Sequence, residues 1–311
     1  MILVTGGAGF IGSNFVKLLA SKTSEEILVL DNFTYASKLG AKEIIKLPII
    51  IIRADILNLD KIENIFTSNK ITTIFHFAAE SHVDNSISNC QPFIDTNITG
   101  TVNLLNLAVK YNVNKFIHIS TDEVFGVADN APFNEKSYIN PLNPYSASKA
   151  AAEHFVNAFA NTYRLNTIIV NCSNNYGPNQ YPEKLIPVAI NKLLSNQKIP
   201  LYGKGEQVRD WLYVEDCCRA IYSVYEKGQI GQRYCIGGEN TMTNMQLVSK
   251  IIEIMGMPDY YFEYVKDRPG HDMIYDTDIT KIKQELGWYP TTSIEEGLKI
   301  TIDRIKNEDR V

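Results

Sequence analysis

The chain has 311 residues, 45% of them hydrophobic, and a formal net charge of -5 at pH 7. A chain of this length can bury a large core, and a typical domain size of about 150 residues predicts one large domain or two unequal ones. The net charge is negative, so the chain has no excess of basic residues for binding phosphates, which argues against nucleic acid as a partner. No apolar run approaches the ~20 residues that span a bilayer. We therefore expect no membrane association and a soluble, cytoplasmic protein.

The cysteines and histidines argue against two further classes. The cysteines are five, an odd number without C-x-x-C spacing, which favours reduced thiols over a disulfide framework. Cys217 and Cys218 are adjacent and could be redox-active, but two small buried residues on a helix are the simpler interpretation. The histidines show no H-E-x-x-H or clustered spacing, so no metal is predicted. The first predicted strand begins at residue 2, and we expect no secretory signal.

Short β-branched runs alternate with helical stretches through the first half of the chain. Such runs are typical of parallel strands that are buried on both faces. The alternation predicts βαβ units with right-handed crossovers. The predicted strands are residues 2–5, 27–30, 49–52, 72–77, 115–119 and 167–171.

The pattern changes after residue 171, where Asn, Gly and Pro occupy residues 174–178 before a helical stretch at 185–195. A second, smaller domain is expected to begin here. The run at 211–214, followed by a helical stretch at 216–227, predicts a return to the first sheet. We therefore expect an α/β protein with two interleaved domains. Residues 1–171 and 206–236 would form a Rossmann-type doubly wound parallel sheet, and residues 172–205 and 237–311 a smaller, mixed α/β substrate-binding domain.

A glycine motif directly follows the first predicted strand. Gly6, Gly9 and Gly12 form G-x-x-G-x-x-G and open a helix. Glycines here permit a tight turn and let backbone N–H groups at the helix N-terminus approach a pyrophosphate. Asp31 ends the second strand about 20 residues further on, where an acid binds the adenosine ribose hydroxyls. Its carboxylate repels a 2′-phosphate and residues 32–34 offer no arginine, so NAD is favoured over NADP.

Two later loops would extend this dinucleotide site. Asp55 and Ile56 follow the third strand and would flank the adenine, although Asp55 could equally be a helix N-cap. Ala78, Ala79 and Ser81 follow the fourth strand and would pass under the nicotinamide ribose. The carboxyl ends of parallel strands share one edge of the sheet, where ligands bind.

The groups that could carry chemistry lie in two segments. Thr121, Asp122 and Glu123 follow the strand predicted at 115–119, and Tyr145 and Lys149 share one face of a helix predicted over 146–159. A nearby ammonium lowers a tyrosine pKa that starts near ~10, so that the phenol can act as a base at neutral pH. Either segment alone could be a polar turn or a chance pair. Together, downstream of a nucleotide motif, they indicate an elimination that passes through a transient ketone.

These motifs resemble those of the extended short-chain dehydrogenase/reductases and, more narrowly, the dTDP-glucose 4,6-dehydratases. The resemblance extends from residue 1 to about residue 288. It rests on the T-G-G-A-G-F-I-G-S start, on the Tyr-x-x-x-Lys pair and on further segments at residues 79–84, 120–124, 171–178, 183–187, 208–216 and 268–272.

The resemblance implies a homodimeric lyase that binds NAD and a nucleotide-diphosphate sugar. It would convert dTDP-glucose or UDP-glucose to the 4-keto-6-deoxyglucose nucleotide and water, in rhamnose-type deoxysugar biosynthesis. The implied cofactor-binding residues are Gly6, Gly9, Phe10, Ile11, Gly12, Asp31, Asn32, Thr34, Asp55, Ile56, Ala78, Ala79, Ser81, Thr96, Tyr145, Lys149 and Asn175. The implied substrate-binding residues are Ser81, Thr121, Asn174, Lys184, Leu185, Pro200, Tyr202, Arg209, Asn244, Arg268 and His271.

The resemblance also implies the catalytic roles. Tyr145 would take the proton of the sugar 4-hydroxyl while the C4 hydride passes to NAD, with Thr121 hydrogen-bonded to that oxygen and Lys149 holding the ribose. Glu123 would then remove the C5 proton as a protonated Asp122 donates to the departing 6-hydroxyl. The hydride would return to C6, so that NAD is regenerated in every cycle.

Other functions fit some of the same motifs. A nucleotide-sugar 4-epimerase or a decarboxylase could use the same scaffold, but an epimerase needs no acid/base pair such as Asp122 and Glu123. A non-catalytic NAD-binding sensor would typically lose Tyr145 or Lys149. The resemblance also implies that Arg209 and Arg268 lie near the diphosphate, and a guanidinium fork suits phosphate oxygens. Arg209 and the next residue, Asp210, could instead form a surface ion pair.

Overall fold

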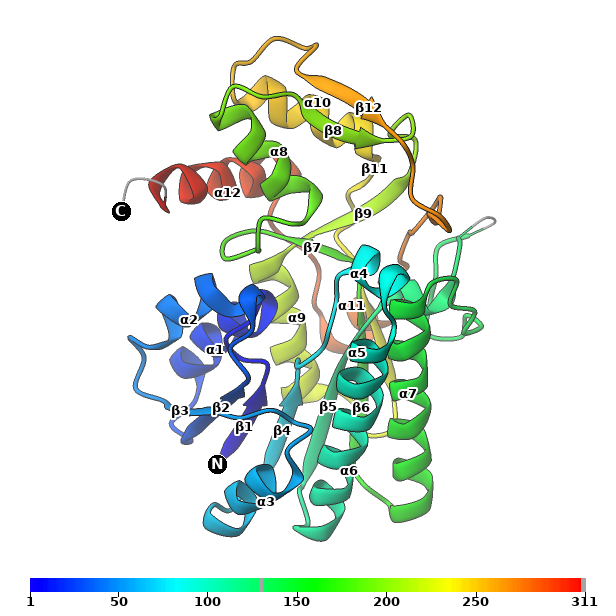
Figure 1. Ribbon diagram of the computed structural model, residues 1–311. Coiled ribbons are helices and arrows are strands. Elements are labelled where there is room, and N and C mark those ends of the chain that lie inside the picture. Colours follow the sequence, from blue (N-terminus) through cyan, green and yellow to red (C-terminus); the bar gives the residue numbers. More distant parts are fainter. Residues whose placement is uncertain (129–130, 309–311) are drawn as a thin grey trace.

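The computed structural model describes residues 1–128 and 131–308 (Figure 1). A seven-stranded parallel sheet forms its larger part, in the order β10-β6-β5-β4-β1-β2-β3. The parallel sheet predicted from the sequence is therefore confirmed, with strand ends that differ by one or two residues. The strands are β1 (Ile2–Thr5), β2 (Ile27–Asp31), β3 (Ile50–Arg53), β4 (Thr73–His76), β5 (Lys115–Thr121), β6 (Thr167–Cys172) and β10 (Arg233–Ile236).

Helices cover both faces of this sheet because alternate strand residues point to opposite sides. Ile2 and Val4 of β1 belong to the core on one face, whereas Leu3 belongs to the core on the other. The first core packs against α1 (Phe10–Lys22), α2 (Lys38–Ile44), α9 (Val214–Lys227) and α11 (Thr280–Leu286). The second packs against α3 (Leu59–Ser68), α6 (Thr101–Lys110) and α7 (Pro144–Tyr163). Between β4 and α6 the chain forms α4 (Val83–Ser88), α5 (Gln91–Phe93) and a π-helical segment, η2 (Ile94–Gly100).

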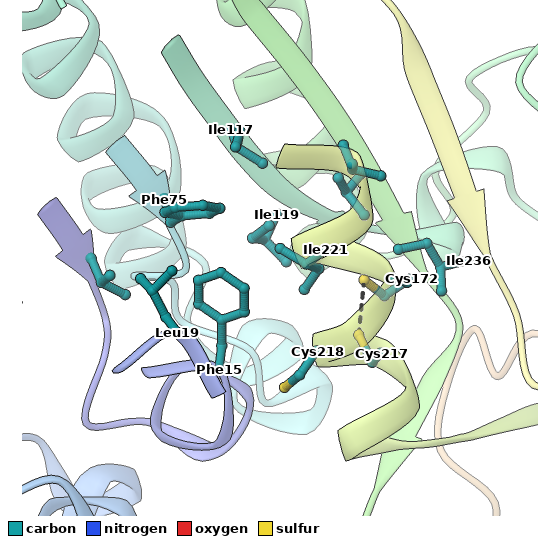
Figure 2. Packing of buried hydrophobic residues seen from close by; sticks show 14 of the residues in the cluster. Phe15, Leu19, Phe75, Ile117, Ile119, Cys172, Cys217, Cys218, Ile221 and Ile236 are labelled. Carbon is teal, nitrogen blue, oxygen red and sulfur yellow. Dashed lines mark hydrogen bonds between the residues drawn. The ribbon is translucent and has the colours of Figure 1, made fainter. Parts of the chain in front are cut away.

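Figure 2 shows how the first core is filled. Phe15 of α1 stacks at a tilt on Phe75 of β4, with ring centroids 4.6 Å apart, and Ile221 of α9 lies beside them. Cys217 and Cys218 are free, buried thiols on α9, as the simpler sequence interpretation expected. They pack as small apolar residues.

A smaller lobe sits above the carboxyl edge of the large sheet (Figure 1). It has its own apolar core, which includes residues of α8, α10 and α12. Its strands form two small sheets, β11-β9-β7 and β12-β8. The elements are β7 (Asn174–Tyr176), α8 (Leu185–Leu194), β8 (Ile199–Tyr202), β9 (Val208–Tyr213), β11 (Thr241–Thr243), α10 (Asn244–Ile254), β12 (Phe262–Val265) and α12 (Ile294–Glu308).

The strand predicted at 211–214 does not return to the large sheet. It is part of β9, which pairs with β7 in parallel and with β11 antiparallel in the smaller lobe. An apolar run predicts a strand but does not identify its partners, which explains the wrong assignment. The chain re-enters the large domain with α9 instead, and α11 packs there against α9 and β10. The interleaved division into two domains stays a proposal. The predicted bounds placed residues 206–213 in the larger domain and residues 280–286 in the smaller one, whereas β9 pairs within the smaller lobe and α11 packs on the larger sheet.

Across residues 1–128 and 131–308, no helix combines the length and apolarity that a membrane crossing needs.

The first core gives a stability prediction. Ile221→Ala should lower the free energy of unfolding by about 2–5 kcal/mol, because the substitution leaves a cavity in a fully buried site. Ile230→Ala is the matched control, since that side chain is 44% exposed, and should change stability by no more than about 0.5 kcal/mol. Urea unfolding followed by circular dichroism measures both. Equal effects of the two substitutions would contradict the packing of this core.

Candidate active site

Two adjoining cavities open at the carboxyl edge of the large sheet. One has a volume of about 260 Å³ and is lined by the loops after β1, β2, β3 and β4. The other, of about 500 Å³, lies between this edge and the smaller lobe. Phe10, Ser81, Tyr145 and Lys184 line both cavities, so the two cavities share part of their walls. Their position matches the edge at which open α/β sheets bind ligands.

The first cavity is built around the glycine turn. Gly6 has φ +69°, and a Cβ at Gly12 would lie 2.2 Å from the carbonyl oxygen of Gly6. The turn therefore has no room for larger residues. A pyrophosphate could then approach the backbone N–H groups at the start of α1 closely. Every residue expected at the cofactor lines this cavity except Asn175, which lines the second one. Those are Gly6, Gly9, Phe10, Ile11, Gly12, Asp31, Asn32, Thr34, Asp55, Ile56, Ala78, Ala79, Ser81, Thr96, Tyr145 and Lys149.

Asp31 organises this cavity as well as lining it. Its Oδ2 accepts a hydrogen bond from the Ala8 amide at 2.9 Å, and its Oδ1 accepts one from the Phe33 amide at 2.7 Å. Burial raises its pKa, and these two backbone donors oppose that rise. Phe33 has a left-handed φ of 56°, so the carboxylate also stabilises an unusual turn after β2. This stabilising contact was not predicted from the sequence.

The alternative that Asp55 caps a helix is wrong. Asn58 is the N-cap of α3, and its side chain accepts a hydrogen bond from the Lys61 amide. Asp55 instead accepts from the Leu57 amide at 2.9 Å and from Nδ2 of Asn32 at 2.8 Å. It therefore joins the loops after β2 and β3 at the rim of the first cavity.

A short turn after β5 carries the proposed acid and base. Thr121 is the last residue of the strand, and its hydroxyl accepts the Glu123 amide at 3.2 Å, which caps a 3-10 helix, η3 (Asp122–Phe125). Gly126 ends that helix with φ +87°. The three side chains from Thr121 to Glu123 all line the second cavity. The strand ends two residues later than the sequence pattern predicts.

The two carboxyls have different surroundings. Burial raises the pKa of Asp122 well above its usual value, and the charges of Glu123 and Asp210 add to this. Burial also raises the pKa of Glu123, but the positive charges of Lys184 and Arg209 oppose the rise. The geometry therefore favours a neutral Asp122 beside a more readily ionised Glu123.

Thr277 holds Asp122 from the other side, with its hydroxyl 3.4 Å from Oδ2. It reaches this position because a bridge to Phe133 fixes its segment along the large domain. This contact joins a residue late in the chain to the turn after β5, and no local sequence motif predicted it.

Tyr145 and Lys149 lie on the first turns of α7, as predicted. The helix begins there because Asn143 forms a capping box with Ser146 around an N-terminal proline. Tyr145 is 9% exposed and lines both cavities. Lys149 lies below it and donates to the Ile119 carbonyl at 2.6 Å.

The pKa of Tyr145 departs from the sequence expectation. Burial raises it, and the charges of Glu123 and Asp122 raise it further, whereas a hydrogen bond with Thr121 opposes the rise. Burial lowers the pKa of Lys149 to about 8, while the charge of Glu153 opposes that fall. The prediction that Lys149 lowers the pKa of Tyr145 below its usual value is therefore wrong for the protein without a bound cofactor. Desolvation and two carboxyls outweigh the ammonium.

The second cavity collects the residues expected at the substrate. Its size falls in the range of small-molecule sites. The set comprises Ser81, Thr121, Asn174, Lys184, Leu185, Pro200, Tyr202, Arg209, Asn244, Arg268 and His271.

Arg209 is not part of a surface ion pair. It is 5% exposed, and its guanidinium donates to the carbonyls of Val208 and Asp272 at 2.7 and 2.8 Å. Its partner in that alternative, Asp210, is fully buried and accepts from backbone amides instead. The guanidinium also lies 4.3 Å from the ring centre of Tyr275. Arg209 is thus fixed at the cavity wall.

Sequence reasoning missed several lining residues. Asp84 accepts from the hydroxyl of Tyr202 at 3.3 Å and pairs with Arg268 at 3.4 Å, which closes one side of the cavity. Tyr275 hydrogen-bonds Asp272 beside Arg209. Asp84 ends one of the motif segments and could have been chosen on that basis, whereas Tyr275 carried no spacing signal.

The fold and these cavities define a dinucleotide-binding enzyme of the extended short-chain dehydrogenase/reductase type. A family model described as GDP-mannose 4,6 dehydratase matches residues 3–301. A dTDP-glucose 4,6-dehydratase from Haemophilus influenzae is 43% identical, over 97% of this chain and 96% of that protein. The chain belongs to the dTDP-glucose 4,6-dehydratase family.

Solved structures agree with this assignment. DesIV, a dTDP-glucose 4,6-dehydratase from Streptomyces venezuelae crystallised with NAD and TYD bound, superposes with a TM-score of 0.95 at 40% identity, covering 99% of this chain and 97% of that one. A UDP-glucuronic acid 4-epimerase from Bacillus cereus, with UDP-glucuronic acid and NAD, superposes with a TM-score of 0.93 at 30% identity, covering 99% of both chains. The fold is therefore shared between dehydratases and epimerases, and the site must separate them.

The glycine turn gives a binding prediction. Gly12→Ala should weaken NAD binding by at least about tenfold, because its Cβ would meet the Gly6 carbonyl at 2.2 Å and the turn must shift. Gly9→Ala should weaken it less, because there the same contact would be 3.2 Å. Calorimetric titration of protein stripped of nucleotide measures both. A larger loss for Gly9→Ala than for Gly12→Ala would contradict the prediction.

Proposed function

We propose that the protein is an NAD-dependent nucleotide-sugar 4,6-dehydratase, a hydro-lyase that converts dTDP-glucose or UDP-glucose to the 4-keto-6-deoxyglucose nucleotide and water. The observation that carries this proposal is the pair of neighbouring carboxyls, Asp122 and Glu123, whose surroundings favour different protonation states in the second cavity. An elimination of water needs one acid and one base on the same substrate. The family relatives support the same reaction.

The first cavity suits NAD. Its glycine turn would hold the pyrophosphate, and Asp31 would accept from the ribose hydroxyls and disfavour a 2′-phosphate. Lys149 would donate to the nicotinamide ribose. When bound, NAD supplies a hydride acceptor and a positive ring charge, which opposes the carboxyl charges that raise the pKa of Tyr145.

Oxidation at C4 would use the residues shared by the two cavities. Tyr145 would take the proton of the 4-hydroxyl, and Thr121, hydrogen-bonded to Tyr145, would also bond the same sugar oxygen. Lys149 keeps positive charge beneath the phenol. The resulting ketone acidifies the C5 proton.

Loss of water would then use the turn after β5. Glu123 would remove the C5 proton, and Asp122 would donate its proton to the departing 6-hydroxyl. A buried carboxyl is suited to this donation because burial raises its pKa and so favours the protonated form. Arg209 and Arg268 would bind the diphosphate at the far end of the cavity.

The epimerase function is less well supported although the fold is shared. Epimerisation requires the ketone and a rotation of the sugar, and it leaves an acid/base pair without a task. The non-catalytic sensor is also disfavoured, because Tyr145 and Lys149 are both present and both line the cofactor cavity.

The direct test is incubation of the purified protein with dTDP-glucose and, separately, with UDP-glucose. Formation of a 4-keto-6-deoxyhexose nucleotide, detected by alkaline absorbance and mass spectrometry, is the expected result. Kinetics with the two substrates would also establish the nucleotide preference, since one methyl group contributes only about 1–3 kcal/mol in a pocket. Conversion to an epimer, or no product from either substrate, would overturn the proposal.

Asp122→Asn tests the division of roles. The variant should still oxidise C4 and accumulate bound NADH, while overall turnover falls by about 10²- to 10⁴-fold, the usual contribution of a general acid. NADH absorbance after rapid mixing measures the first effect. Normal turnover without NADH accumulation would show that Asp122 has another role.

The same variant has a stability signature. The pKa of Asp122 is raised in the folded protein, so its protonation contributes to the free energy of unfolding. This contribution is complete below the unfolded pKa of ~3.9 and is lost as the pH rises through the folded pKa. An asparagine side chain does not titrate and has no such dependence. The melting temperature of Asp122→Asn relative to the parent should therefore rise with pH, and a flat difference would contradict the raised pKa.

Assembly, location and pathway are part of the same proposal. A homodimer is supported by family resemblance and by exposed apolar side chains on α7, such as Phe155 at 41% and Tyr163 at 55%. Free thiols at all five cysteines support a reducing, cytoplasmic location. The product would serve deoxysugar synthesis of the rhamnose type.

A further inference from the structure

Three polar side chains beneath the turn after β5 form a buried group, which we call the strand-end network. Nδ2 of Asn171 lies 2.8 Å from the carbonyl oxygen of Thr121 and 2.7 Å from Oε1 of Glu153. Arg233 donates to Oδ1 of Asn171 at 2.8 Å and lies 2.7 Å from Oε2 of Glu153. The network consists of Asn171, Glu153 and Arg233.

Each member of the network comes from a different element. Asn171 lies on β6, Glu153 on α7 and Arg233 on β10. Asn171 and Glu153 are fully buried, and the Arg233 guanidinium covers the ring of Phe125 at 5.4 Å. The network therefore ties the end of β5 to two further strands of the same sheet and to α7, at the point where the turn leaves the strand.

Stability alone does not account for this arrangement. Burying a carboxylate and a guanidinium carries a desolvation cost that their pairing only partly offsets, so well-packed apolar side chains of similar volume would serve stability at least as well. The polar network is directed at one backbone atom, the Thr121 carbonyl. That atom belongs to the residue from which Asp122 and Glu123 extend.

Glu153 also acts on Lys149, which lies four residues earlier on the same helix. The charge of Glu153 opposes the effect of burial on the lysine pKa, which is about 8. The ammonium itself donates to the Ile119 carbonyl at 2.6 Å. The carbonyls of Ile119 and Thr121, two residues apart on β5, are thus both bound by side chains that Glu153 contacts or influences.

Other titratable groups around Lys149 are neutral near pH 7. Burial lowers the pKa of His76 on β4 to about 3 and that of His118 on β5 well below its usual value. The pKa values of the Cys172 thiol on β6 and of Tyr145 on α7 are raised. Their neutral forms leave the carboxylate of Glu153, which also pairs with Arg233 at 2.7 Å, as the charge that favours a protonated Lys149.

We propose that Glu153 is a positioning residue of this active site: through Asn171 it fixes the Thr121 carbonyl, and its carboxylate, which pairs with Arg233 and lies one helical turn along α7 from Lys149, also serves as the buried counter-ion of the lysine ammonium. The proposal rests on the proposed dehydratase function for its catalytic consequence. Glu153 touches neither cavity. It affects catalysis indirectly, because it fixes the direction of the turn after β5 and favours the charged form of Lys149.

Glu153→Gln is the first test, because glutamine keeps the shape and one acceptor oxygen but removes the charge. The lysine should lose its proton at lower pH, so the alkaline decline in both NAD affinity and kcat should move down by about one pH unit. At pH 8 we expect kcat to fall about tenfold while KM changes by less than about twofold. Glu226→Gln, an exposed site on α9, is the matched control and should leave both profiles unchanged.

Two further variants separate the two roles of Glu153. Asn171→Ala removes the tether to the Thr121 carbonyl but keeps the carboxylate, so kcat should fall about tenfold with the alkaline decline at its original pH. Arg233→Met keeps the carboxylate and removes its partner, so the decline should stay in place or move to higher pH. Glu153→Asp, which restores the charge, should recover the pH profile at least in part.

The outcomes distinguish this proposal from the proposed function. NAD affinity as a function of pH requires no sugar, so a downward shift in Glu153→Gln would support the counter-ion role even if no sugar nucleotide were converted. Unchanged pH profiles in folded, NAD-bound Glu153→Gln would overturn that role. Unchanged kcat in Asn171→Ala would overturn the tether. If Glu153→Gln does not fold, an alkaline decline at lower pH in Arg233→Met would overturn the counter-ion role.

Discussion

Burial of two adjacent carboxyls is the constraint on which the site depends. Two neighbouring acids cannot both ionise without cost in a desolvated environment. Asp122 lies against Thr277 and in the field of Asp210, whereas Glu123 lies in the field of Lys184 and Arg209. The same burial therefore suits one group to act as an acid and the other to act as a base in the proposed reaction. A polar turn at the end of a strand thereby becomes a site that can expel water from a sugar.

The parallel sheet makes this possible because it collects several strand ends at one edge. The loops after β1 to β4 form the cofactor cavity, and the turn after β5 meets the smaller lobe at the substrate cavity. Tyr145 lines both spaces, which suits a reaction that removes a hydride and later returns it. Beneath that edge, the buried contacts of Lys149 and Asn171 hold the carbonyls at the end of β5. The dinucleotide fold thus supplies the cofactor site and the support for the elimination.

Much of the site could be predicted because its residues follow strands or share a helix face. The glycine turn, Asp31 and the Tyr145–Lys149 pair are local patterns with a direct physical meaning, and the structure brings them to one cavity. The errors arose where tertiary contacts decide. An apolar run did not reveal that β9 pairs with β7 and β11, and a four-residue spacing did not reveal that carboxyl charges would raise the pKa of Tyr145.

The sequence by itself determined the α/β class, the family and the identity of many of the residues at the two cavities, because apolar strand runs, glycine turns and helix spacing act over short distances along the chain. Only the tertiary structure decided how those residues are charged and held. Thr277, Asp272 and Asn171, which bond Asp122, Arg209 and the Thr121 carbonyl, lie 155, 63 and 50 residues away from them in the chain. A pKa depends on burial and on charges nearby in space, and neither can be read from neighbours in the chain.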